Sequence, residues 1–291
     1  MSCVTRRERK SDLTKDIAML RLFTALFISL FLGFPALAVT PLDHAHAHND
    51  YWHERPLFDA LDHGFMSIEA DIMLRDGRLL VGHTASELSD ERTLQALYLD
   101  PLQALIRDQG GKVYPGQDQP LILLVDLKQD GPDTYRALEK LLPAYADMLT
   151  SYRDGVVTPG AVTLVLTGSS AWQVLRMEKE RYAFTDASYV ELNLNMPPEA
   201  MVMLSQKWTQ ITHWKGEGPL NENEDRFIRK IIAKGHERGA KVRFYATPDE
   251  PGPGRDAVWT YLLDAGVDLI NTDDLDGLSD FFAARAASAE K

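Results

Sequence analysis

The stretch Ser67-Ile-Glu-Ala-Asp-Ile-Met-Leu74 combines one apolar face with a pair of carboxylates, and it decides how the rest of the chain is interpreted. Alternate side chains of a β-strand share a face. The isoleucines and Ala70 therefore face one way, whereas Glu69 and Asp71 face the other. Burying two neighbouring carboxylates is costly unless a cation or a proton compensates. The pattern predicts a divalent ion held by oxygen ligands, or else two salt bridges to Arg or Lys.

A second stretch, Leu121-Ile-Leu-Leu-Val-Asp-Leu-Lys128, repeats the pattern, with Asp126 and Lys128 on one face at the end of an apolar run. In parallel barrels the carboxyl ends of the strands carry the active site. We expect Asp126 to supply a third carboxylate ligand and Lys128 to hold a phosphate oxygen. The alternative is a self-contained ion pair at the surface.

The segment His44-Ala-His-Ala-His-Asn-Asp50 places three histidines on one strand face. Such a run is compatible with a transition-metal site or with simple surface polarity. In a third interpretation His48 is a general acid or base, since histidine titrates near neutral pH, and Asn49 is a neutral oxygen ligand. The apolar run Leu79–Val81 leads to a second candidate acid or base, His83.

Strand-like and helix-like segments alternate from about Pro41 onward. Eight such strands in about 240 residues predict an α/β fold of the (β/α)8 TIM-barrel type. A doubly wound open sheet is the alternative, weakened because no glycine-rich dinucleotide motif follows the first strand. The expected strands are His44–Asn49, Met66–Leu74, Leu121–Lys128, Val162–Thr167, Tyr182–Ala187, Gln210–Trp214, Lys241–Ala246 and Asp268–Thr272, and the expected helices are Pro56–His63, Thr93–Gln109, Thr134–Met148, Ser170–Glu180, Pro198–Lys207, Glu222–Arg238 and Ala257–Ala265.

The N-terminal segment looks like a targeting signal rather than part of the fold. An apolar run from Leu20 ends in Ala36-Leu-Ala38, the form of a secretory signal peptide over residues 1–38. This predicts export to the periplasm or the medium, with translation starting at Met1 or Met19. A membrane anchor is the alternative, because the run is about as long as a membrane-spanning helix. Residues 39–291 are then expected to form a single barrel domain.

The 291 residues carry a net charge of −12, which argues against wrapping of nucleic acid or binding to an anionic membrane. An acidic protein that handles phosphate needs local positive charge, and a bound metal ion is one source. The sequence shows no sign of an obligate protein partner.

Taken together, these motifs resemble the phospholipase C-like phosphodiesterase superfamily, which includes the glycerophosphodiester phosphodiesterases. The chain is most similar to the branch named after altered inheritance of mitochondria protein six. The similarity rests on His-Asn, Glu-x-Asp, Gly-His and Asp-x-Lys in that order. Departures from typical glycerophosphodiester enzymes include His-Asn-Asp in place of His-Arg-Gly, so an arginine that would meet phosphate there is absent. The segments that carry the similarity are His48–Trp52, Pro56–Leu61, Glu69–Asp71, Leu80–His83 and Thr93–Pro101.

The resemblance implies a metal-dependent phosphoric diester hydrolase of lipid metabolism, acting on a glycerophosphodiester or phospholipid-type substrate. It implies His48 and His83 as the acid–base pair, and Lys128 as a phosphate ligand. It also implies Mg²⁺ or Ca²⁺ as the cofactor. The metal ligands it implies are Glu69, Asp71, Asp126 and Asn49.

Two other classes of function remain open from the sequence. A barrel of this kind can lose its chemistry and act only as a head-group-binding module, since fold does not fix function. An amidohydrolase would use the His-x-His pattern as zinc ligands and needs further histidines at later strand ends. His213 is the only candidate for such a histidine.

Overall fold

The computed structural model describes residues 39–169, 172–193, 196–197 and 199–289. Val39–Lys291 forms one compact unit. None of the helices formed by the described residues has both the length and the apolar character that a membrane crossing requires. The predicted signal peptide, residues 1–38, lies outside the described residues and stays a prediction.

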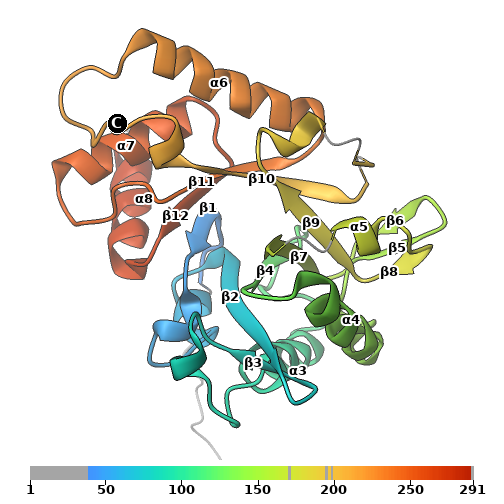
Figure 1. The fold of residues 1–291 in the computed structure, drawn as a ribbon. Helices are drawn as coiled ribbons and strands as arrows, with labels where there is room; N and C mark the ends of the chain where they lie inside the picture. The colour runs from blue at the N-terminus through green and yellow to red at the C-terminus, as the bar shows by residue number, and fades with distance from the viewer. Residues whose placement is uncertain (1–38, 170–171, 194–195, 198, 290–291) are drawn as a thin grey trace, which may run out of the picture. The chain divides into compact units, whose positions relative to one another are not determined.

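Eight parallel strands close into a barrel, as the alternation of elements predicts (Figure 1). They follow one another in chain order around the ring, and the last strand pairs with the first. A short antiparallel strand, β3 (Arg78–Val81), pairs with the carboxyl end of the second barrel strand, over residues 72–75. The barrel strands are β1 (Leu42–Ala47), β2 (Phe65–Arg75), β4 (Leu121–Leu127), β7 (Val162–Gly168), β9 (Ala183–Ala187), β10 (Met201–Lys207), β11 (Lys241–Tyr245) and β12 (Leu269–Thr272).

Helices surround the ring and cover the outer faces of the strands (Figure 1). The α-helices are α2 (Phe58–Asp62), α3 (Asp100–Asp108), α4 (Gly131–Leu141), α5 (Trp172–Leu175), α6 (Glu222–Glu237), α7 (Pro253–Asp264) and α8 (Leu275–Ala289). A π-helical turn, η3 (Gln95–Leu99), precedes α3, and 3₁₀ turns are formed by η1 (Asp50–Trp52), η2 (Ala85–Glu87), η4 (Leu142–Tyr145), η5 (Glu191–Asn193) and η6 (Trp208–Gln210).

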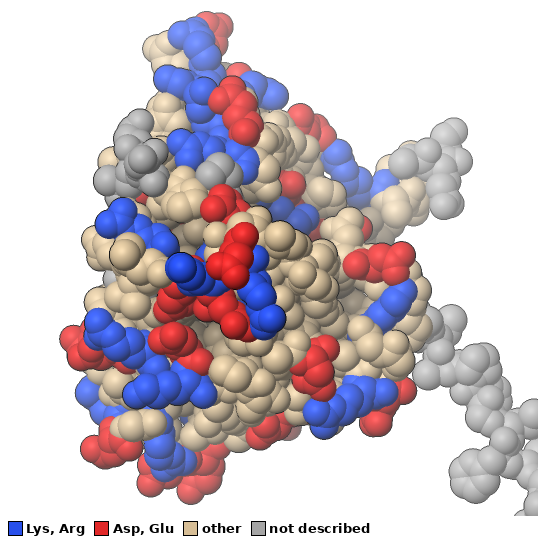
Figure 2. Space-filling model, turned by 90° about the vertical axis from the view of Figure 1, so that its right-hand side faces the viewer, with Lys and Arg blue, Asp and Glu red and all other residues tan. Residues whose placement is uncertain are grey.

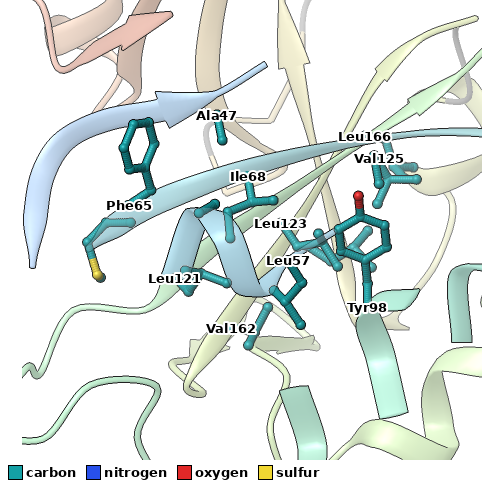
Figure 3. Close-up of a cluster of buried hydrophobic side chains, with 14 of the residues drawn as sticks. Ala47, Leu57, Phe65, Ile68, Tyr98, Leu121, Leu123, Val125, Val162 and Leu166 are labelled. Carbon is teal, nitrogen blue, oxygen red and sulfur yellow. The ribbon is translucent and has the colours of Figure 1, made fainter. Parts of the chain in front are cut away.

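The apolar face of β2 packs outward, as its alternation predicts. Ile68 is fully buried in the main hydrophobic cluster, together with residues of β4. Figure 3 shows Leu57 and Tyr98, from the segments outside the barrel, gathered against Leu123 and Val125 of β4. This packing leaves the opposite face of β2, with Glu69 and Asp71, directed into the barrel.

One barrel strand was predicted in the wrong place. The sequence pattern favoured a helix over Pro198–Lys207 and a strand over Gln210–Trp214, whereas the sixth strand is β10 at Met201–Lys207. Met, Leu, Gln and Lys are good helix formers, which explains the error. Pairing with β9 and β11 on either side overrides this local preference.

A small antiparallel sheet lies beside α5, outside the barrel (Figure 1). It was not predicted from the sequence. Its strands are β5 (Ser151–Arg153), β6 (Val156–Thr158) and β8 (Glu180–Arg181). Figure 2 views the molecule from the right-hand side of Figure 1. Acidic and basic side chains are interspersed over the face seen in that view.

Candidate active site

Three carboxylates meet inside the barrel near the carboxyl ends of β2 and β4. Asp71 and Asp126 lie opposite each other in the parallel register of these strands, and Glu69 is two residues earlier on the same face as Asp71. One oxygen from each of the three residues lies within 4.8 Å of the others. The convergence predicted from the two strand patterns is therefore present.

Two basic side chains contact this acidic cluster. Arg243 Nη1, from β11, lies 2.6 Å from Glu69 Oε2, and both side chains are buried. Lys128 Nζ lies 3.2 Å from Asp71 and 3.0 Å from Asp126. The salt bridges foreseen as an alternative to a metal are thus formed, yet two cations leave one of three negative charges uncompensated.

Burial and the neighbouring charges shift the pKa values of Glu69, Asp126 and Lys128. Burial alone would raise the pKa of Glu69, but Arg243 and the hydrogen bond from His46 hold it well below its usual range. Burial raises the pKa of Asp126, and the neighbouring charge of Asp71 adds to the effect. Burial opposes protonation of Lys128, but its two carboxylate partners outweigh burial and raise its pKa.

The cluster fits a divalent metal ion. Asp71 Oδ1 is buried and has no hydrogen-bond partner among the described residues, and an unsatisfied buried oxygen costs about 1–3 kcal/mol. Carboxylate oxygens are the ligands that Mg²⁺ and Ca²⁺ prefer. A divalent ion would satisfy that oxygen. It would also turn the net charge of the three acids and their two basic partners from −1 to +1, which suits a phosphodiester anion.

Both predicted catalytic histidines have a carboxylate on Nδ1. His83 Nδ1 lies 2.7 Å from Asp71 Oδ2, and His48 Nδ1 lies 2.8 Å from Asp273 Oδ1. A carboxylate on Nδ1 fixes the ring so that Nε2 is available for proton transfer. Burial lowers the pKa of His48, but the bond to Asp273 and the charge of Glu69 outweigh it and raise the pKa above its ordinary value.

The other two histidines of the first strand do not join His48 in a metal site. His44 Nδ1 lies 2.8 Å from the carbonyl oxygen of Asp268. His46 is fully buried, with Nδ1 2.7 Å from Ser67 and Nε2 within 3.0 Å of both Glu69 and Arg243. Burial and the charge of Arg243 lower the pKa of His46 to about 4. Three histidines on one face therefore have three different surroundings, and the transition-metal interpretation fails.

Asn49 lies next to the acidic cluster. Its backbone is left-handed, with φ 48° and ψ 38°, a conformation that asparagine tolerates better than most residues. The Tyr51 hydroxyl lies 2.9 Å from Asn49 Oδ1 and 2.8 Å from Asp71 Oδ2. The amide oxygen is thus held beside a carboxylate of the cluster, where the resemblance predicts a neutral ligand.

A cavity of about 350 Å³ opens over these groups. All the predicted site residues except Asp71 line it. The remainder of its wall is rich in hydroxyl and acidic groups, with Trp172 and Tyr245 as aromatic members. These polar residues are Thr167, Ser169, Thr185, Asp186, Ser188, Glu191 and Ser205.

Three residues of the site were missed as functional from the sequence: Arg243, Asp273 and Asp186. Arg243 is a charged residue in the middle of the buried strand β11, and that position was a signal. Asp273 and Asp274 both follow the last strand, and this pair is typical of a helix cap. The structure gives that role to Asp274, whose Oδ1 accepts from the Gly277 amide. Asp186 accepts from the Thr167 hydroxyl, and burial raises its pKa to about 6.

Gly168, at the end of β7, is required by the position of Asp126. Its φ is +80°, and a Cβ added there would lie 1.8 Å from Asp126 Oδ1. We expect Gly168→Ala to cost about 1–2 kcal/mol in backbone strain and also to displace the Asp126 carboxylate. Metal binding, measured by calorimetric titration, should weaken.

Gly155→Ala is the matched control for this prediction. Gly155 has a similar φ of +92°, but nothing lies within 4 Å of its added Cβ. Urea denaturation should therefore show a comparable loss of stability in both variants, with weakened metal binding in Gly168→Ala alone. Equal metal affinity in the two variants would contradict a role for Gly168 in placing Asp126.

Comparison with protein families connects this geometry with known proteins. The model described as "AIM6-like phosphodiesterase domain" matches residues 36–186. The model described as "Glycerophosphoryl diester phosphodiesterase family" matches residues 241–276. The two matched segments include the acidic cluster and Arg243.

Similar proteins include fungal relatives and a bacterial structure. The "Altered inheritance of mitochondria protein 6 homolog" of Arthroderma benhamiae is 31% identical, over 81% of this chain and 83% of that protein. "Altered inheritance of mitochondria protein 6" of Eremothecium gossypii is 30% identical, over 84% and 70%. The crystal structure of a glycerophosphoryl diester phosphodiesterase from Parabacteroides distasonis has a TM-score of 0.50 at 16% identity, covering 86% of this chain and 88% of that one. It supports the barrel fold.

Proposed function

The chain belongs to the AIM6-like phosphodiesterase domain family, and from that membership we propose that it is a metal-dependent phosphoric diester hydrolase. The proposed substrate is a small-molecule or lipid phosphodiester, of the glycerophosphodiester or phospholipid type. The observation that carries the proposal is the pair of carboxylate-bound histidines, which line one cavity with an acidic cluster.

In this proposal His48 and His83 move the protons. One imidazole accepts the proton of the attacking hydroxyl through Nε2, and the other gives a proton to the departing alcohol. Asp273 and Asp71 hold the two rings through Nδ1. If the attacking hydroxyl belongs to the substrate the first product is a cyclic phosphate, and if it belongs to water the ester is hydrolysed directly. Positioned proton transfer contributes about 10²–10⁴-fold per group.

The proposed metal ligands are Glu69, Asp71 and Asp126, with Asn49 as a neutral fourth. When bound, Mg²⁺ or Ca²⁺ supplies positive charge that stabilises the phosphoryl oxygens as charge develops. Lys128 touches two of the three acids and is placed to offset the charge of a phosphate beside them.

The hydroxyl and acidic residues of the cavity wall between Thr167 and Ser205 favour a hydrophilic group on one side of the phosphodiester. Their hydroxyl and carboxylate groups offer hydrogen bonds to the hydroxyl or amine groups of such a substituent. A glycerol-like or other polar head group fits this lining better than an acyl chain, because hydrocarbon would remove water from these polar groups and offer no hydrogen bonds in return.

A substrate panel tests the proposed function. The purified protein is incubated with bis-p-nitrophenyl phosphate and several glycerophosphodiesters, after chelation and then with Mg²⁺ or Ca²⁺ added back. We expect metal-dependent release of the alcohol, with ³¹P NMR distinguishing a cyclic from an open product. Turnover that survives chelation would contradict the metal-dependent mechanism.

The second candidate is a barrel that binds a phosphodiester head group without cleaving it. The fold and the family fit both functions, since function depends on the site rather than the fold. The intact histidine–carboxylate pairs favour catalysis. Saturable binding of glycerophosphodiesters without turnover of any member of the panel would establish the binding function instead.

A further inference from the structure

Arg243 approaches the candidate site from the strand opposite β4. It lies on β11, in register with Ser205 of β10, and its buried side chain points into the barrel and lines the cavity. Its guanidinium carbon is 5.7 Å from the ring centroid of Tyr245, another residue of the cavity wall. A buried arginine at this place is held by more than one acceptor.

Its hydrogen bonds to described residues come from two of the three guanidinium nitrogens. Nη1 lies 2.6 Å from Glu69 Oε2, 2.6 Å from His46 Nε2 and 3.0 Å from Asn271 Oδ1. Nε donates to the Ser205 hydroxyl at 3.4 Å. The hydrogen bonds that Arg243 makes to described residues thus involve Nη1 and Nε.

The two N–H groups of Nη2 remain for another acceptor. A guanidinium presents its donors in a rigid planar fork, so fixing Nη1 and Nε also fixes the direction of Nη2. The residue lines the cavity, so Nη2 is the guanidinium nitrogen that is left for a ligand bound there. Such donors recognise the oxygens of phosphate esters particularly well.

We propose that Arg243 has two roles: it positions Glu69 through Nη1, and it binds a non-bridging oxygen of the phosphodiester through Nη2. The second role rests on the proposed function. Arg243 would then supply the guanidinium that the His48-Asn-Asp50 segment lacks, from β11, which is separated from β1 by β12 alone. Lys128 contacts Asp71 and Asp126, and Arg243 contacts Glu69, so the phosphate meets a cation from each side of the acidic cluster.

The test separates the two roles by calorimetric titration of the full chain. Arg243→Lys keeps a cation that can pair with Glu69 but lacks the fork, whereas Arg243→Ala removes both functions. The probes are Mg²⁺ alone and then dimethyl phosphate in Mg²⁺-containing buffer. The matched control is Arg255→Lys, because Arg255 is a similarly buried arginine that pairs with Asp274 and lines a different cavity.

We expect Arg243→Lys to bind Mg²⁺ within about threefold of the wild type. Its affinity for dimethyl phosphate should fall about 10- to 100-fold, the range for hydrogen bonds to charged groups. Arg243→Ala should weaken binding of both probes, and Arg255→Lys should change neither. Circular dichroism establishes that each variant is folded before titration.

Unchanged dimethyl phosphate affinity in Arg243→Lys would overturn the proposal, as would a wild type that does not bind this probe. The titration does not depend on turnover. If the wild type binds dimethyl phosphate through Arg243 but cleaves no phosphodiester, the proposed hydrolase function fails while the assignment of Arg243 stands.

Discussion

Replacing His48 or His83 with alanine is expected to lower phosphodiester turnover by about 10²- to 10⁴-fold in each case. Each imidazole has its Nδ1 bound to a carboxylate, and the one polar contact of either Nε2 among the described residues is the 3.5 Å approach of Asn49 Nδ2 to His48. Removing one ring deletes either the base or the acid of the proposed reaction. Steady-state kinetics with the substrate found in the panel measures the effect.

Loss of turnover through unfolding must be separated from loss of chemistry. The His48 side chain is 28% exposed and the His83 side chain 46% exposed, so neither truncation leaves a large cavity in the core. We expect the melting temperatures of both variants to stay close to that of the wild type. A matched control is His44→Ala, since His44 lies on β1, the strand that leads to His48, but bonds to the carbonyl oxygen of Asp268.

His44→Ala should retain full activity. Near-normal activity in both the His48 and the His83 variant would eliminate the two-histidine mechanism. A large loss in the His83 variant alone would mean that a group other than His48 transfers the second proton. Asp273, which is bound to His48, is the nearest candidate for that group.

Asp126→Asn is expected to remove most of the metal-dependent activity and of the stabilisation by metal, without lowering the thermal stability of the metal-free protein. Asp126 shares the site with two other carboxylates within 4.8 Å, and burial together with Asp71 already raises its pKa. Removing its charge relieves repulsion in the metal-free state. Activity should fall by at least the ~10–100-fold that losing an outer-sphere partner of a metal costs.

Thermal unfolding with and without metal measures both effects. An ion present at 100 times its dissociation constant stabilises the folded state by about 2.7 kcal/mol, so the melting temperature of the wild type should rise with Mg²⁺ or Ca²⁺. The increase should be smaller in Asp126→Asn. Asp133→Asn, an exposed acid on α4 paired with Arg136, should respond to metal as the wild type does. An identical metal response in Asp126→Asn would rule out Asp126 as a ligand.

Much of the fold was predictable because its signals are local. The alternation in Ser67–Leu74 and Leu121–Lys128 defined both strands and their inward faces, and parallel pairing then placed Asp71 beside Asp126. The sixth strand was misplaced because Met201–Lys207 contains good helix formers. There the pairing with two neighbouring strands, which is not encoded locally, decided the conformation.

The sequence by itself determined the barrel, the three acids and the family resemblance, since each depends on the order and spacing of residues close in the chain. Only the tertiary structure decided which groups complete them. Asp273 meets His48 across 225 positions, and Arg243 meets Glu69 across 174. Closure of the ring brings the last strands beside the first, so the second half of the chain supplies charges that no local pattern in the first half predicts.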